Sequence, residues 1–136
     1  MKKFSVALEI RTKLASLGEL ARLMGIPISA NISYSIGEEK FEGGLFSDTL
    51  AVVELESKYG ELPTLMQCMQ DKLELVPIHD IFGSFSDLKI SLYIAAFHDN
   101  AYCSVSILPQ HADFFGRRNI TMDIYAYPVN KDEWNE

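Results

Sequence analysis

The side chains able to do acid–base or metal chemistry are few, and they lie far apart in the sequence. The three histidines are His79, His98 and His111; none has the i, i+4 partner of an H-E-x-x-H zinc site or lies beside a cysteine. Glu54 and Glu56 share one face of a predicted strand, where two carboxylates could do acid–base work if one were buried. Such a pair is more often part of a solvated face. We therefore expect no catalytic residue, no metal site and no cofactor, and we predict that the protein is not an enzyme.

Nucleophilic and phosphate-binding motifs are also missing from the sequence. It contains no G-x-S-x-G elbow, no GxGxxG fingerprint and no Walker loop. The two cysteines, Cys68 and Cys103, lack CxxC spacing; the first falls in a helical apolar pattern and the second in a predicted strand. Both patterns predict reduced thiols that pack in the core as small hydrophobic groups.

Charge is the most distinctive chemical feature of the chain. The formal net charge is −7, and residues 38–61 hold seven acids against two lysines, a local excess of five negative charges. Such a field repels nucleic acid and anionic lipid, and it accelerates encounter with a basic protein. We therefore expect neither a nucleic-acid nor a membrane partner. Solubility alone is the simpler explanation of the charge, and the sequence does not decide between the two.

A glycine-rich loop, "GEEKFEGGLFSD" at residues 37–48, combines acids with two phenylalanines. Aromatic side chains supply the apolar anchor that charges alone do not give, although we expect at least one of the two to fold back onto the core. Trp134, in the acidic tail, is a second candidate, as either an anchor or a lid over the core. The predicted partner-binding residues are Glu38, Glu39, Phe41, Glu42, Phe46, Asp48 and Trp134.

The length of 136 residues fits a single domain spanning residues 1–136. No run of about 18 apolar residues exists, so no transmembrane helix is expected. Glu9 and Arg11 interrupt the apolar start before it reaches the length of a signal-peptide core. These features predict a cytoplasmic protein.

Local signals place three helices. Ser16 and Glu19 have the spacing of a capping box, and Gly25 with Pro27 ends the helix that follows. Pro63 suits the first turn of a second helix with an apolar stripe, and Pro109 opens a short third helix. Residues 76–86 read as a connector with a helical turn.

Alternating or apolar stretches predict six strands, at residues 4–11, 28–36, 49–57, 87–97, 102–108 and 120–127. The predicted order is β-α-β-β-α-β-β-α-β. Helices packed on one face of a mostly antiparallel sheet satisfy this order, so the predicted fold class is α+β, a two-layer sandwich.

The last strand, "ITMDIYAY", alternates over eight residues and has an unusual aspartate at its centre. We expect Asp123 to be structural, hydrogen-bonded by hydroxyl groups on its own face, and the opposite face to be buried. The predicted core comprises Phe4, Val6, Leu8, Ile10, Leu17, Leu20, Met24, Val52, Leu65, Met69, Leu92, Ile94, Ile120, Met122 and Ile124.

The stretches "LARLMGIP" (residues 20–27) and "DIY" (residues 123–125), in an order that opens and closes on a strand, resemble a family of small bacterial proteins. That family is known only as a domain of unknown function, and this chain departs from its pattern at residues 109–119. The resemblance implies an immunity protein of the kind found in contact-dependent inhibition or polymorphic toxin systems. The partner that it implies is a cognate toxin, expected to be a basic nuclease.

Three functions therefore compete at this stage. The first is an acidic, non-catalytic immunity protein that neutralises a toxin by direct binding. The second is a small enzyme or small-molecule-binding domain with a pocket between sheet and helices. The third is an oligomerisation module that pairs through a sheet edge or face, and the sequence leaves the oligomeric state open.

Overall fold

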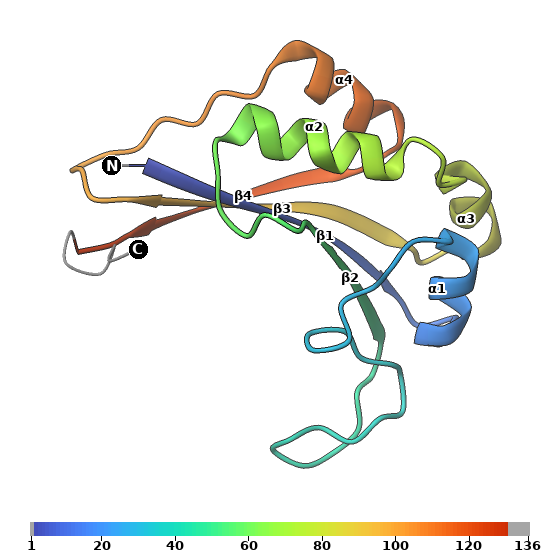
Figure 1. Cartoon of the computed structure of the whole chain (residues 1–136). Helices are drawn as coiled ribbons and strands as arrows, with labels where there is room; N and C mark the ends of the chain where they lie inside the picture. Colours follow the sequence, from blue (N-terminus) through green and yellow to red (C-terminus); the bar gives the residue numbers. More distant parts are fainter. Residues whose placement is uncertain (1, 131–136) are drawn as a thin grey trace.

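The computed structural model describes residues 2–130 and has the predicted α+β class. Four helices and four strands form within those residues, with the helices gathered on one face of the sheet (Figure 1). In chain order the elements are β1 (Lys2–Thr12), α1 (Leu17–Met24), β2 (Thr49–Glu54), α2 (Leu62–Leu73), α3 (Ile78–Ser84), β3 (Lys89–His98), α4 (Pro109–Arg117) and β4 (Thr121–Pro128).

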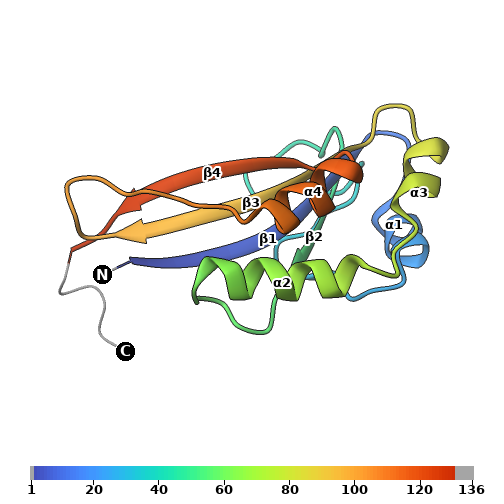
Figure 2. The same ribbon diagram turned by 90° about the horizontal axis from the view of Figure 1, so that it is seen from above.

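The sheet is mixed, and its strands lie in the order β2-β1-β3-β4. β1 runs antiparallel to both β2 and β3, whereas β4 runs parallel to β3. The parallel pair follows from the connection, because a parallel neighbour requires a crossover, and α4 supplies it. β2 and β4 are therefore the two edges of the sheet (Figure 2).

The helix boundaries follow the local signals in the sequence. The Ser16 side chain accepts the Glu19 backbone N–H (3.2 Å), and the Glu19 carboxylate accepts the Ser16 N–H, so the capping box forms. Gly25 ends α1 at φ 68°, in the left-handed region that glycine adopts without steric cost. Pro63 lies in the first turn of α2, and Pro109 in that of α4, where a missing N–H costs no hydrogen bond.

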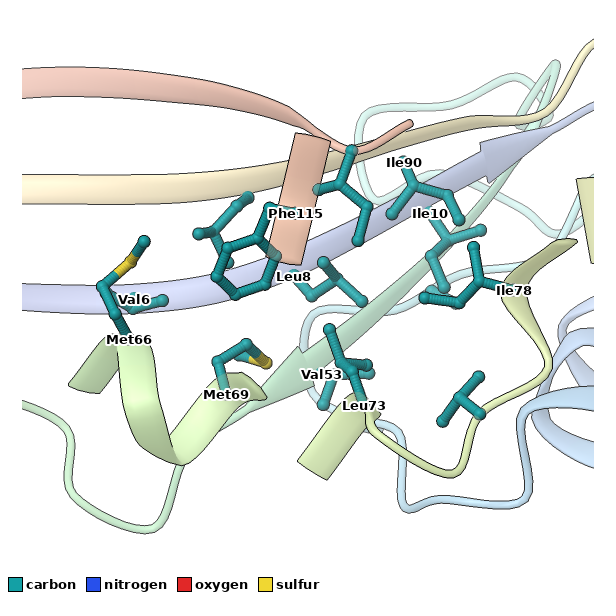
Figure 3. Packing of buried hydrophobic residues seen from close by; sticks show 14 of the residues in the cluster. Val6, Leu8, Ile10, Val53, Met66, Met69, Leu73, Ile78, Ile90 and Phe115 are labelled. Atoms are coloured by element: carbon teal, nitrogen blue, oxygen red, sulfur yellow. The ribbon is translucent and has the colours of Figure 1, made fainter. Parts of the chain in front are cut away.

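The core fills the space between the sheet and the helices (Figure 3). β1 contributes its even-numbered side chains, since alternate residues of a strand face opposite sides. Met66, Met69 and Leu73 of α2 meet them along one helical stripe. Leu65 is buried on the same helix. Phe115 of α4 is completely buried and packs in the core between the sheet and α2 (Figure 3).

Most of the predicted core is buried, with four differences. Leu17 and Met122 are only partly buried, and Ile124 is 45% exposed, so its placement in the core is wrong. Ile124 does point to the helix side of the sheet, but β4 is an edge strand and no helix covers its second half (Figure 2). Val52 is buried on the opposite side, outside the main cluster, because β2 pairs its odd-numbered residues with the core face of β1.

Two predicted strands do not form. Residues 28–36 run beside β2 with a turn and one isolated bridge, because serine and asparagine side chains favour turns over a ladder. Residues 102–108 are extended and alternate as expected, with Cys103, Val105 and Ile107 packed against the core. Among residues 2–130 no strand pairs with this segment, so the predicted hairpin is wrong. The connector at residues 76–86 contains a full helix, α3.

Two expectations about single side chains also differ. Cys68 is exposed on α2, so it is not a core thiol, whereas Cys103 is partly buried. The hydroxyl of Tyr127 pairs with Tyr93 rather than with Asp123, and among residues 2–130 none hydrogen-bonds to the half-buried Asp123 carboxylate. Within the same range, no helix is long and apolar enough to cross a membrane.

Candidate partner-binding site

The acidic loop folds into a small hairpin, which we define as residues 37–46. Gly37 donates its backbone N–H to Phe46 (3.0 Å), and Phe46 donates to Glu38 (2.9 Å), so the two arms are paired at the base. Lys40 donates to Gly44 (2.9 Å) and closes the turn. Hydrogen bonds across the whole hairpin give it a defined conformation, and it projects from the β2 edge away from the helices (Figure 1).

The tip of the hairpin exposes an aromatic ring between acids. Gly43 and Gly44 both have positive φ (97° and 80°), which permits the tight turn. Phe41 is fully exposed, at 105% of its reference area. Glu42 directly after it and Glu39 two positions before it are also exposed, with Lys40 between Glu39 and Phe41. A phenylalanine held entirely in water gives up all of its hydrophobic stabilisation, about 1.5–3 kcal/mol. Burial against another molecule would recover it.

Phe46 holds the base of the hairpin. Its ring stacks on Tyr34 with ring centroids 3.8 Å apart and an interplanar angle of 13°. The Lys40 ammonium lies 5.7 Å from the Phe46 ring centroid. Phe46 is therefore a structural residue that orients the tip, and of the two loop phenylalanines only Phe41 is available to a partner.

Arg11 of β1 fastens this base to the sheet. Its guanidinium donates to the Tyr34 hydroxyl (3.0 Å) and to the Asp48 carboxylate (3.4 Å). Partial burial alone would lower the pKa of Arg11, but the bonds to Tyr34 and then Asp48 outweigh it and raise that pKa. Asp48 is half-buried and bound to Arg11, so it positions the hairpin rather than offering a free charge.

Further bonds tie the chain on either side of the hairpin to the body. Thr49 is fully buried; its hydroxyl donates to the Ala15 carbonyl (2.6 Å) and accepts the Ile36 N–H (2.9 Å). Ser35 accepts the Leu17 N–H at the start of α1 (3.1 Å). Hydrogen bonds on both sides therefore hold the hairpin to the body of the protein.

The structure brings part of the predicted site together. Glu38, Glu39, Phe41 and Glu42 all lie exposed on the hairpin, whereas Phe46 and Asp48 form its base. Trp134 lies outside the described residues. Leu45, 60% exposed, also belongs to this surface, and its place beside the double glycine was the signal that could have identified it.

Metal-ligand clusters and cavities are the features that a catalytic or small-molecule site would use. No group of three or more His, Cys, Asp or Glu side chains within residues 2–130 could hold a metal ion. A cavity of about 290 Å³ lies where β1 ends and β3 begins, lined by Arg11, Thr12, Lys13, Asp48, Asp87 and Lys89. Asp87 accepts the Thr12 hydroxyl (2.5 Å) and the Lys13 N–H (2.6 Å), and these two bonds lower the pKa of Asp87. Asp87 therefore joins the end of β1 to the segment that leads into β3.

Sequence reasoning missed an aromatic cluster on the face of the sheet opposite the helices. Tyr93 stacks on Tyr125 (4.8 Å between centroids), and Phe97 stacks on Tyr127 (5.3 Å). The parallel register of β3 and β4 brings these four rings together. Burial, followed by the hydrogen bond to Tyr127, raises the pKa of Tyr93 to about 12.

Comparison with known proteins gives no relative: no family model, curated protein or solved structure matches the chain.

Proposed function

We propose that the protein is a non-catalytic binding protein that neutralises a basic bacterial toxin by direct contact through the hairpin. The observation that supports this proposal is the fully exposed Phe41, with exposed Glu39 and Glu42 within two residues of it, on a hairpin that hydrogen bonds hold to the sheet. A central aromatic anchor surrounded by charges is the usual composition of an energetically dominant contact in a protein interface. The acids provide attraction at a distance, and the ring provides apolar contact after docking.

The class of partner follows from charge. A nuclease toxin carries a basic surface because it must hold the phosphates of RNA or DNA. An inhibitor with a net charge of −7 and acids at the tip of an arm is complementary to such a surface. The hairpin would occupy the substrate site, and the field would accelerate association.

The test is to co-express the chain with the product of the neighbouring gene, the candidate toxin, and to isolate the complex. Stopped-flow association is then measured with Glu38, Glu39 and Glu42 all replaced by glutamine. We expect association at low salt to slow by about tenfold and to lose most of its salt dependence. The Phe41→Ala variant should dissociate roughly 30-fold faster, as expected for a dominant contact.

Two controls separate position from composition. Glutamine at Glu54, Glu56 and Glu74, which are also exposed, makes the same change in net charge away from the hairpin and should change association much less. Leu75→Ala removes another exposed apolar side chain and should leave dissociation unchanged. Equal slowing by both glutamine triples, or an unchanged dissociation rate for Phe41→Ala, would refute the hairpin as the binding surface.

A further inference from the structure

The free edge of β4 has backbone groups that nothing in the described chain satisfies. Val129, directly after β4, donates its N–H to the His98 carbonyl of β3 (2.7 Å). In a parallel pair alternate residues direct their backbone groups to the neighbouring strand, so the odd-numbered residues of β4 face β3. The N–H and C=O groups of Met122, Ile124 and Ala126 therefore point outward. No residue within 2–130 hydrogen-bonds to them.

The side chains along this edge are equally uncovered. Ile124 is 45% exposed although it lies on the helix side, and Tyr125 is exposed on the opposite face. The edge is eight residues long and contains no proline before its last position. A long and partly apolar edge is a template for another strand, and proteins ordinarily shorten, charge or cover such an edge.

We propose that the β4 edge binds β4 of a second copy of this chain, antiparallel, about a two-fold axis through Ile124. The sequence of the strand is complementary to itself in this register alone. Ile124 would face Ile124, and Met122 would face Ala126 in both directions. These outward-facing pairs would exchange about six backbone hydrogen bonds and join two sheets into one.

The competing registers are worse for identifiable reasons. The axis must pass through a residue, because outward-facing residues have to meet outward-facing residues. An axis through Asp123 would set two carboxylates directly opposite each other, which is destabilising. An axis through Tyr125 would place Met122 opposite Pro128, which has no N–H to donate. The axis through Ile124 instead sets Asp123 opposite Tyr125, which offers a phenolic hydroxyl to a carboxylate that has no partner within residues 2–130.

Net charge opposes this contact, and the opposition predicts a characteristic salt dependence of self-association. Each copy carries a charge of −7, so the copies repel each other at long range. Salt screens this repulsion, and it should therefore strengthen self-association while it weakens binding to a basic toxin. The two proposals make opposite predictions for salt and fail independently.

Sedimentation velocity over about 1 µM to 1 mM protein measures the association. We expect a reversible dimer that tightens between about 0.05 and 0.5 M salt. Ile124→Lys places a charge at the centre of the edge and should weaken the dimer at least tenfold. Leu75→Lys makes a similar change at a side chain that is 94% exposed on the connection after α2, and it should leave the dimer intact.

Cross-linking tests the register without relying on the charge variant. Asp123→Cys and Tyr125→Cys are each made in a background where Cys68 and Cys103 are serine. Opposed residues of a non-hydrogen-bonded pair lie about 4.5 Å apart at Cα, within disulfide range. Oxidation of a mixture should link one variant to the other, and neither alone should form a disulfide dimer. Self-linking of either variant would overturn the register, and a monomer at every concentration would overturn the proposal.

Discussion

The two edges of the sheet differ in whether their outward-facing backbone groups have hydrogen-bond partners. At β2, the outward-facing groups of Leu50 and Val52 are all satisfied: Leu50 exchanges two bonds with Tyr34 (both 2.9 Å), and Val52 receives the Ser29 N–H (2.8 Å) and donates to the Ser33 hydroxyl (3.0 Å). At β4, the corresponding groups have no partner within residues 2–130. An irregular segment can thus satisfy the outward-facing backbone groups of Leu50 and Val52 as a strand would.

The difference also separates two kinds of contact. The segment that pairs with the β2 edge also carries the acidic hairpin, so that edge holds the hairpin in place (Figure 1). The β4 edge offers a backbone ladder and an aromatic face. A charged arm suits a partner of opposite charge, whereas a bare ladder suits a strand of any protein that matches its register.

The largest expected effect contrasts the centre of the sheet with its open edge. Leu92 of β3 is completely buried, and Leu92→Ala should reduce the free energy of unfolding by about 2–5 kcal/mol because it leaves a cavity. Ile124→Ala on β4 should cost less than about 1 kcal/mol at a dilution where the chain is monomeric. Urea unfolding of both variants measures this, and similar losses would mean that the β4 edge is covered in solution.

A smaller effect contrasts two threonines, one at each edge. Thr49→Val removes a hydroxyl that bonds both Ala15 and Ile36, and it should cost about 1–3 kcal/mol of unfolding free energy. Thr121→Val makes the same change at an exposed position on β4 and should alter stability by no more than about 0.5 kcal/mol. Thermal unfolding of the pair at low concentration is sufficient. Equal effects would show that the bonds of Thr49 do not hold the segment in place.

The smallest expected effect is a titration on the aromatic face. The folded-state pKa of Tyr93 is raised to about 12, first by burial and then by its bond to Tyr127. The unfolded chain would lose this proton near pH 10, so the stabilising contribution is complete below about pH 10 and is lost as the pH rises through about 12. Tyr127→Phe should lower the pKa of Tyr93 without returning it to the ordinary value, as followed by tyrosinate absorbance. An unchanged titration would mean that the hydroxyl pair does not form.

Sequence patterns predicted those features that depend on neighbours along the chain. Ser16, Glu19 and Gly25 set the limits of α1 through contacts within a few residues, and the alternation of β1 determined which side chains enter the core. Alternation also gave the correct side for Ile124, but burial depends on what lies above it, and that is set by where α4 packs. An alternating pattern predicts which face of a strand a side chain lies on more reliably than whether another element packs over that face.

The candidate site was predictable only in part for the same reason. Acids, glycines and phenylalanines in residues 37–48 predicted an exposed loop, but the different fates of Phe41 and Phe46 depend on Tyr34, which comes from the preceding segment. The position of Asp48 depends on Arg11, 37 residues away. The aromatic cluster was missed because its four rings meet only through the parallel register of β3 and β4.

Amide hydrogen exchange, residue by residue, compares the two edges most directly. In dilute solution we expect the amides of Leu50 and Val52 to be protected by Tyr34 and Ser33. The amides of Met122, Ile124 and Ala126 should exchange at nearly the rate of an unstructured peptide. When the protein is concentrated in high salt, these three should become protected together, while the β2 amides do not change.

Equal protection of both edges in dilute solution would contradict the account, because it would mean that part of the same chain already covers β4. Rapid exchange at Leu50 and Val52 would contradict it from the other side. The segment after α1 would then not be held against β2, and the acidic hairpin would not have the defined position from which it is proposed to bind.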